Sequence, residues 1–507
     1  MAKGIIGKSI LNAAAGMTML VTGFASSVIT ARLLGPEANG TVAFAFWLTT
    51  TGTLIAGLGS DVILARMLPQ LTAEGFDERQ RRGFAAFVAQ FVLIAILTTL
   101  AVLVVINSQT DSIASMLGPR TIILLTGLLF FLQAIGTMSV NVLIGEQRPL
   151  VFFRLTIISS ILQLVVTIVG ALYYGVAGAL SGYLASYLVF FVYALRLLAV
   201  KPQRCGIGFG ILIKASLYIS LGTIIESIFL NRIELAFLQH FQGVHAVGFY
   251  AIAITLANLA LQLPVQLSGT LVPYYTELAH KQGSTKLPVH LFEDVIRILA
   301  YMALPMGLGL AAISWEVVTD IFGDDFAGAG TIVALLALSA PLSVFSQIST
   351  KYLFAIGQEQ PRLIIGVIGA LTITVGCLLI VPVYGAEGAA VARIIMLAVI
   401  SGLMVARMDF EGSLAGMFAS LAKLGLASLV CAVDAYFVSR LVDGLLGTAL
   451  GIITGAALYL VCLRLFHAVP AKDTDALRIL SDRLPRKAGI LIKGVAAFMS
   501  GKPNGGI

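Results

Sequence analysis

The stretch YYGVAGALSGY at residues 173–183 lies between two long apolar runs, and a related stretch, VYGAEGAAVAR, occurs at residues 383–393. The two stretches align Gly175 with Gly385, and apolar runs of about 20 residues, long enough to cross a bilayer, flank both of them. Each stretch therefore predicts a turn between two membrane-spanning helices. The hairpin is present twice in the chain.

Two further pairs of segments show that the duplication extends beyond this turn. LLGPEANGTVAFAF (33–46) aligns with FQGVHAVGFYAIAI (241–254), and GEQRPLVFFRL (145–155) aligns with GQEQPRLIIGV (357–367), at nearly the same offset. Because each repeat contains six predicted spans, an even number, both repeats enter the membrane in the same direction. Parallel repeats of this kind are related by an axis along the membrane normal, and they permit alternating access between two facing bundles.

The composition of the whole chain agrees with a membrane protein. Of 507 residues, 59% are apolar and 11% are charged, and the mean hydropathy is +0.99. A soluble chain cannot bury so much apolar surface, which excludes a soluble enzyme, a nucleic-acid-binding protein and a secreted scaffold. The sequence predicts an all-α polytopic membrane protein with about 14 transmembrane helices, formed as two parallel six-helix repeats plus two C-terminal helices.

The predicted spans lie at residues 10–31, 41–68, 84–106, 121–144, 152–173, 177–200, 209–238, 247–278, 289–314, 327–356, 362–382, 386–406, 415–440 and 443–466. They group into an N-terminal six-helix bundle (1–204), a second six-helix bundle (205–412), helices 13 and 14 (413–468) and a basic amphipathic cytoplasmic tail (469–507). The tail is either an interfacial helix on the anionic cytoplasmic leaflet or a partly ordered segment.

Positive charges predict the orientation. The chain has 32 Lys and Arg against 25 Asp and Glu, a net charge of +7. With the N-terminus in the cytoplasm, all Lys and Arg fall on the inner side except Arg32, Arg120, Arg232, Arg393 and Arg440. This bias is typical of the positive-inside rule, and it predicts a multi-pass membrane protein with both termini cytoplasmic.

The segment ARLLGPEANG (31–40) after the first helix, the paired GVAGA and GAEGAA turns and the six plus six plus two arrangement resemble the bacterial polysaccharide flippases. These form part of the multidrug/oligosaccharidyl-lipid/polysaccharide exporter superfamily. The resemblance covers residues 1–466 and implies an inner-membrane flippase that moves undecaprenyl-diphosphate-linked oligosaccharide repeat units to the outer leaflet, for exopolysaccharide or lipopolysaccharide biosynthesis. It implies a polysaccharide polymerase and a chain-length regulator as partners.

No motif supports catalysis. The sequence lacks G-x-S-x-G, H-E-x-x-H and the P-loop G-x-x-x-x-G-K, and its four cysteines are scattered singly, which argues against a zinc site. We therefore expect a transporter that is not an enzyme, with no cofactor, no metal and no nucleic-acid partner.

The candidate site residues are polar or charged side chains inside predicted spans, where each charge is costly unless it faces a cavity or a partner. For the substrate diphosphate the first candidate is Arg232, since a guanidinium binds phosphate bidentately, and for the sugar the amides are candidates. The predicted substrate-binding residues are Arg232, Arg32, Arg393, Asn231, Asn258, Gln262 and Gln266. Glu226, Glu234 and Asp61 are candidates for ion coupling, and the alternative for every charged residue is a structural ion pair.

Three other functions compete. A cation-coupled multidrug exporter usually has twelve spans and an acidic residue in its first helix, which this chain lacks. A peptidoglycan-precursor flippase is expected to carry several arginines inside helices one, two and eight, and helix eight of this chain has none. A membrane-embedded polysaccharide polymerase or ligase usually needs a large outer loop, whereas the longest outer connection predicted here is short.

Overall fold

The structure is a computed structural model that describes residues 2–110, 119–206, 222, 224–267, 287–355, 359–408, 410–411 and 415–475, with a few isolated positions in the tail. Within these ranges the regular structure is helical, apart from a two-residue parallel pair formed by β1 (Leu287–Pro288) and β2 (Phe410–Glu411). The chain divides into two compact units: residues 1–251 with 373–389, and residues 252–372 with 390–507. The bundle boundary predicted between residues 204 and 205 stays a prediction.

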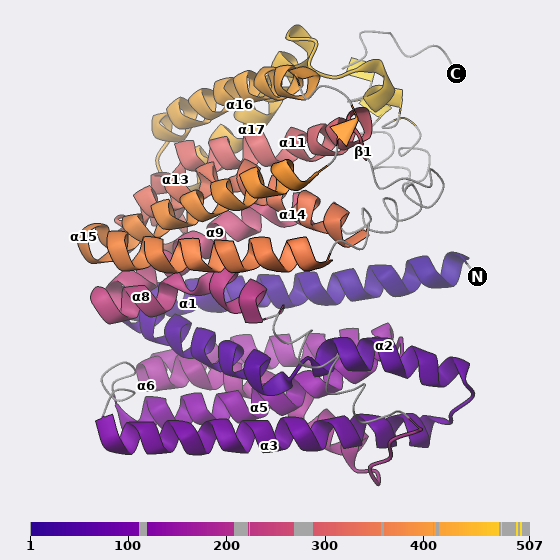
Figure 1. Cartoon of the computed structure of the whole chain (residues 1–507). Helices are drawn as coiled ribbons and strands as arrows, with labels where there is room; N and C mark the ends of the chain where they lie inside the picture. Colours follow the sequence, from indigo (N-terminus) through magenta and orange to yellow (C-terminus); the bar gives the residue numbers. More distant parts are fainter. Residues whose placement is uncertain are drawn as a thin grey trace. The chain divides into compact units, whose positions relative to one another are not determined.

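The first unit contains six helices, a π-helical segment and the start of a seventh helix. These are α1 (Ala2–Gly57), α2 (Ser60–Ala73), α3 (Glu78–Thr110), α5 (Arg120–Gly145), α6 (Pro149–Leu198), the π-helical η1 (Ile225–Leu230), α8 (Glu234–Phe241) and the first turns of α9 (Val244–Leu267) (Figure 1). Its apolar core joins α2, α3 and α5 around the fully buried Leu64, Leu68 and Phe84.

The second unit contains the rest of α9 and the helices that follow it. These are α11 (Val289–Ala312), α12 (Ser314–Phe322), the 3-10 turn η3 (Asp324–Phe326), α13 (Ala329–Leu338), α14 (Ala340–Ala355), α15 (Glu359–Arg407) apart from its residues 373–389, which belong to the first unit, α16 (Ala415–Leu441) and α17 (Leu445–Leu465). The tight packing of α17 on α16 comes from glycines four residues apart. The carbonyls of Ala435 and Cys431 in α16 lie against Gly451 and Gly455, where a larger residue would separate the helices.

Nine helices of the described residues are long and apolar enough to cross a membrane. Three of them, α1, α6 and α15, each contain a glycine with non-helical dihedrals that divides the helix into two spans, and α13 with α14 forms one more span bent by 43°. The described residues thus hold thirteen of the fourteen predicted spans, and the remaining one, 209–238, begins in residues outside the description. The fold class is confirmed: the chain is an all-α polytopic membrane protein.

The backbone at equivalent turns of the two repeats is nearly the same. Gly175 has φ 58° and ψ −133°, and Gly385, its partner in the sequence alignment, has φ 54° and ψ −134°. Gly35 and Gly243, another aligned pair, both have φ 80°. A residue with a side chain is strained in these backbone conformations. Both repeats therefore use glycine at these turns for the same reason.

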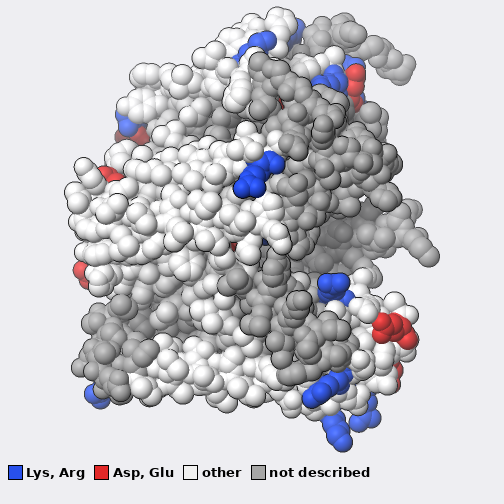
Figure 2. Space-filling model, viewed as in Figure 1, with Lys and Arg blue, Asp and Glu red and all other residues white. Residues whose placement is uncertain are grey.

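The surface of the helices is apolar and the interior carries hydroxyls and amides. On α6, Ile161 and Leu172 are exposed by 60% and 63%, while Thr156 and Thr167 are fully buried. Figure 2 shows that on the visible face charged side chains are sparse and most of the described surface is uncharged. This distribution suits a bilayer, where apolar side chains contact lipid and polar ones pair with neighbouring helices.

Candidate transport site

The π-helical segment η1 contains the predicted site residue Glu226, and a second one, Asn231, follows it directly. A π-helix hydrogen-bonds from i to i+5, so Glu226 and Asn231 lie about one turn apart, and both side chains are exposed. Such segments within spans often mark functional positions because they change which side chains face a cavity. The sequence treated residues 209–238 as a regular helix, and nothing in the order of residue types signals the π-helical turn.

Arg232 follows this segment directly and is partly buried. It interacts electrostatically with the hydroxyl of Tyr183 on α6, and the Tyr183 ring packs against Phe46 of α1 with 5.0 Å between ring centroids. Glu234, in the first turn of α8, is fully buried. Arg232 therefore lies beside α6 in the first unit, with Glu226, Asn231 and Glu234 on the same stretch of chain.

The other candidates lie on separate elements. Arg32 is exposed near the end of the first half of α1, and Asp61 is partly buried in the first turn of α2. On α9, Asn258 is exposed and Gln262 is partly buried one turn later, whereas the side chain of Gln266 lies outside the described residues. Arg393 is partly buried in the second half of α15. Their assembly with Arg232 into one binding site stays a prediction.

Many hydroxyl and amide side chains inside the spans bind neighbouring helices. The Gln163 amide of α6 donates a buried hydrogen bond of 3.0 Å to the Ser26 hydroxyl of α1, and the Gln133 amide of α5 donates one of 3.1 Å to Thr50 of α1. Thr18, Thr30 and Thr126 donate to the carbonyls four residues before them. For Gln163 and Gln133 the structure favours helix packing over substrate contact, whereas the three threonine hydroxyls are satisfied within their own helices.

Gly40 on α1 and Gly248 on α9, which the sequence alignment pairs as equivalent positions, touch each other in the structure. A methyl group on Gly40 would overlap the carbonyl oxygen of Val244, and one on Gly248 would overlap the carbonyl oxygen of Pro36. The Asn39 amide donates to the Gly248 carbonyl at 3.4 Å. The contact is reciprocal, because each glycine meets the residue four positions before the other, as at a two-fold interface.

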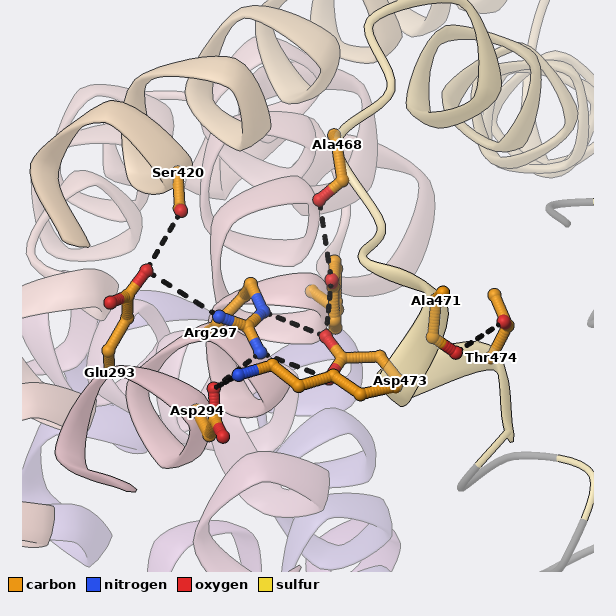
Figure 3. Close-up of polar contacts among 10 residues, drawn as sticks. Glu293, Asp294, Arg297, Ser420, Ala468, Ala471, Asp473 and Thr474 are labelled. Atoms are coloured by element: carbon orange, nitrogen blue, oxygen red, sulfur yellow. Dashed lines mark hydrogen bonds and ion pairs between the residues drawn. The ribbon is translucent and has the colours of Figure 1, made fainter. Parts of the chain in front are cut away.

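A cluster of buried charges, which we call the Arg297 cluster, lies in the second unit at the start of α11 (Figure 3). The Arg297 guanidinium is 2% exposed; its Nε and Nη2 donate to the Asp473 carboxylate at 2.7 and 3.0 Å, and Nη2 also donates to Asp294 at 2.7 Å. Asp294 is paired in turn with Lys472 at 2.6 Å.

Two hydroxyl groups extend the Arg297 cluster to neighbouring helices. The Tyr301 hydroxyl donates to Asp473 at 2.9 Å, and the Ser420 hydroxyl of α16 donates to Glu293 at 3.1 Å. The cluster therefore ties the segment after the last span to α11 and α16 (Figure 3). On sequence alone, Arg297 counted only toward the inner positive charge, because its partner Asp473 lies far away in the chain.

Comparison with solved structures defines the class of fold. The chain resembles the lipid II flippase MurJ in an inward closed conformation, with a TM-score of 0.72 and 16% identity over 90% of this chain and 99% of that one. It also resembles an inward-facing multidrug resistance MATE family transporter of the MOP superfamily, with a TM-score of 0.60 and 18% identity over 78% and 97% of the two chains. At these identities the likeness establishes the fold alone, which this chain shares with both transporters.

Sequence comparison gives the family. The family described as "polysaccharide biosynthesis protein" matches residues 29–329, more than half of the chain. The succinoglycan biosynthesis transport protein ExoT of Rhizobium meliloti (strain 1021) is 24% identical over 473 residues, which cover 87% of this chain and 89% of ExoT. The chain therefore belongs to this polysaccharide biosynthesis family, and the resemblance expected from the glycine turns is confirmed.

Proposed function

We propose that the protein is a flippase that moves polyprenyl-diphosphate-linked oligosaccharide repeat units from the cytoplasmic to the outer leaflet of the inner membrane, for exopolysaccharide or lipopolysaccharide biosynthesis. The observation that carries the proposal is the reciprocal Gly40–Gly248 contact between equivalent helices of two parallel repeats, in a chain of this family. Two repeats that meet at a symmetric, close contact suit a transporter that opens alternately to the two sides.

The proposed orientation places both termini in the cytoplasm. It is supported by the positive charges of the sequence, and it puts the Gly40–Gly248 contact at the outer ends of their helices. In this orientation the contact closes the pathway on the outer side, and its separation opens the route for substrate release.

The proposed substrate contacts follow the chemistry of the ligand. Arg232 binds the diphosphate through its permanent charge and planar fork, with Arg32 and Arg393 as further phosphate ligands. Asn231, Asn258, Gln262 and Gln266 supply amides for the sugar hydroxyls. Glu226, Glu234 and Asp61 are the proposed positions for proton or cation coupling, because a buried carboxylate can titrate near neutral pH.

The test of this function is deletion of the gene in its own bacterium. A flippase of this kind predicts loss of the exported polysaccharide, together with accumulation of lipid-linked repeat units that stay inaccessible to an impermeant sugar-modifying enzyme added outside. The proposed polymerase and chain-length regulator should co-purify with the protein after mild crosslinking. Continued export of polymerised sugar by the deletion strain would contradict the proposal.

One observation favours a second candidate, a peptidoglycan-precursor flippase: the fold likeness to MurJ. Expression of this chain in cells depleted of their own lipid II flippase separates the two functions. Rescue of growth would favour the peptidoglycan substrate, and failure to rescue, with restored polysaccharide export in the deletion strain, would favour the first proposal.

A further inference from the structure

A groove of about 350 Å³ lies between the two halves of α6, on the outward surface of the first unit. Its walls are apolar, with Leu155 and Leu162 from the first half and Leu188 and Val192 from the second half. Tyr193 and Arg196 close one end of it. The volume falls within the range of small-ligand sites, and the walls would accept a hydrocarbon chain.

The register of the hairpin places a second arginine at the same end. Near the turn, Gly170 lies against Gly178, and Thr167 lies against Gly182. The two antiparallel halves of α6 rise equally per residue. Counting the same number of residues away from these contacts along each half therefore places Leu162 level with Leu188, and Arg154 level with Arg196. The groove therefore begins at Arg196, with Arg154 at the same level on the neighbouring half of α6, and runs toward the middle of the hairpin.

Arg154 and Arg196 are not neutralised by any of the described residues. Both side chains are exposed, and within the part of the chain that the structure describes neither has an ion pair or hydrogen-bond partner. Arg148, before the start of α6, differs: its guanidinium is paired with Glu78 at 2.7 Å and with Glu146 at 3.0 Å. The positive charge at the mouth of the groove is thus available to an anion.

The length of the groove matches one leaflet. From Arg196 to Leu188 the helix rises about 12 Å, close to half of a hydrocarbon core about 30 Å thick. A phospholipid acyl chain extends through one leaflet, whereas a polyprenyl chain is much longer than the groove. The charge at the mouth also selects against a lipid with a neutral headgroup.

We propose that this groove is a binding site for an anionic glycerophospholipid, with one acyl chain between the halves of α6 and the phosphate at Arg154 and Arg196. In the proposed orientation this lipid belongs to the cytoplasmic leaflet, whose anionic lipids favour basic positions at helix ends. The site depends only on the described geometry of α6, and it holds whichever substrate the protein transports.

The test is native mass spectrometry of the purified, delipidated full-length protein, titrated with phosphatidylglycerol or with phosphatidylcholine of the same acyl chains. We expect phosphatidylglycerol to bind more tightly. The double substitution Arg154→Gln/Arg196→Gln should weaken its binding about tenfold or more, because each basic residue near the membrane surface contributes about 1 kcal/mol. The double Lys variant keeps the charge and should retain most of the binding.

Two more variants separate the groove from a general charge effect. Val192→Trp fills the groove without changing the charge, and it should weaken phosphatidylglycerol binding. Arg407→Gln removes an exposed arginine from the last turn of α15 and should leave binding unchanged. Size-exclusion profiles identical to that of the unmodified protein show that each variant is folded.

Four results would overturn the proposal. The first is equal binding of phosphatidylglycerol and phosphatidylcholine, and the second is a loss in Arg407→Gln as large as in the double Gln variant. The third is tighter binding of polyprenyl phosphate than of phosphatidylglycerol at the same residues, which would make a polyprenyl lipid the occupant. If Val192→Trp binds phosphatidylglycerol normally, the acyl chain does not lie in this groove and the proposal is wrong.

Discussion

Gly40 and Gly248 lie in backbone contact with each other, although 207 residues separate them in the chain. The contact is reciprocal: Gly40 meets the carbonyl of Val244, and Gly248 meets that of Pro36. These glycines are aligned with each other in the sequences of the two repeats, so each one meets the segment that corresponds to its own. No residue larger than glycine fits on either side without moving one of the two helices.

Substitution of Gly40 by alanine is therefore expected to push α1 and α9 apart. Overpacking at such a contact costs about 1–3 kcal/mol, and if the contact closes the outer end of the pathway, most of the polysaccharide export should be lost. Export by the deletion strain that carries the variant, at equal protein level, checks this. Gly425→Ala is the matched control, since nothing lies within 4 Å of the added methyl group; equal export by both variants would refute the closing role.

Arg232 is the residue on which the proposed diphosphate contact depends most. Loss of a charged hydrogen bond costs about 1.5–3 kcal/mol, so Arg232→Gln should lower the export rate roughly tenfold to a hundredfold, and Arg232→Lys should retain part of it. Arg120→Gln, which removes an exposed arginine at the start of α5, serves as the control and should export normally. Normal export by Arg232→Gln would remove Arg232 from the site.

The Arg297 cluster predicts that substitution of a buried member destabilises the protein more than substitution of an exposed member. Replacement of Arg297 by methionine leaves carboxylates of Asp473 and Asp294 without their buried partner, and it should destabilise the protein by about 3–5 kcal/mol. Lys472→Ala removes an ion pair whose lysine side chain is 55% exposed, and it should cost at most about 1 kcal/mol. Thermal unfolding of the two variants in detergent, monitored by size exclusion, measures this difference. Equal unfolding midpoints for the two variants would contradict the structural role of the cluster.

Cys205 offers a test of both topology and local environment. It lies after α6 and is partly buried; its thiol contacts the Gln80 carbonyl at 3.5 Å, and burial and the nearby Asp77 raise the pKa of the thiol. Because the thiolate is the reactive form, labelling by a maleimide should be slow at neutral pH and should continue to rise at a pH where an ordinary cysteine has levelled off.

The same reagent, in a membrane-impermeant form, distinguishes the two sides of the membrane. Cys205 should react only after the cells are opened, whereas a cysteine introduced at the exposed Asp325 should react in intact cells. The reverse pattern would invert the proposed orientation. Cys377, Cys431 and Cys462 are buried and should contribute little background.

The sequence by itself determined the features that depend on local chemistry. The spans follow from hydropathy, because a helix in lipid must be apolar over about 20 residues. The breaks at Gly35, Gly175 and Gly385 follow from glycine, because their backbone conformations strain other residues. The duplication was visible because these turns recur at nearly one offset, and the family followed from the same turns.

Only the tertiary structure decided the features that join distant parts of the chain. Arg297 is an ordinary inner-side charge in the sequence, and its burial depends on Asp473, which reaches it only after six further helices have packed. The π-helical turn at Ile225–Leu230, which carries Glu226, has no signature in residue order. The Gly40–Gly248 contact needs both repeats to be folded, because hydropathy and turn propensity act over a few residues while close packing depends on which helices become neighbours.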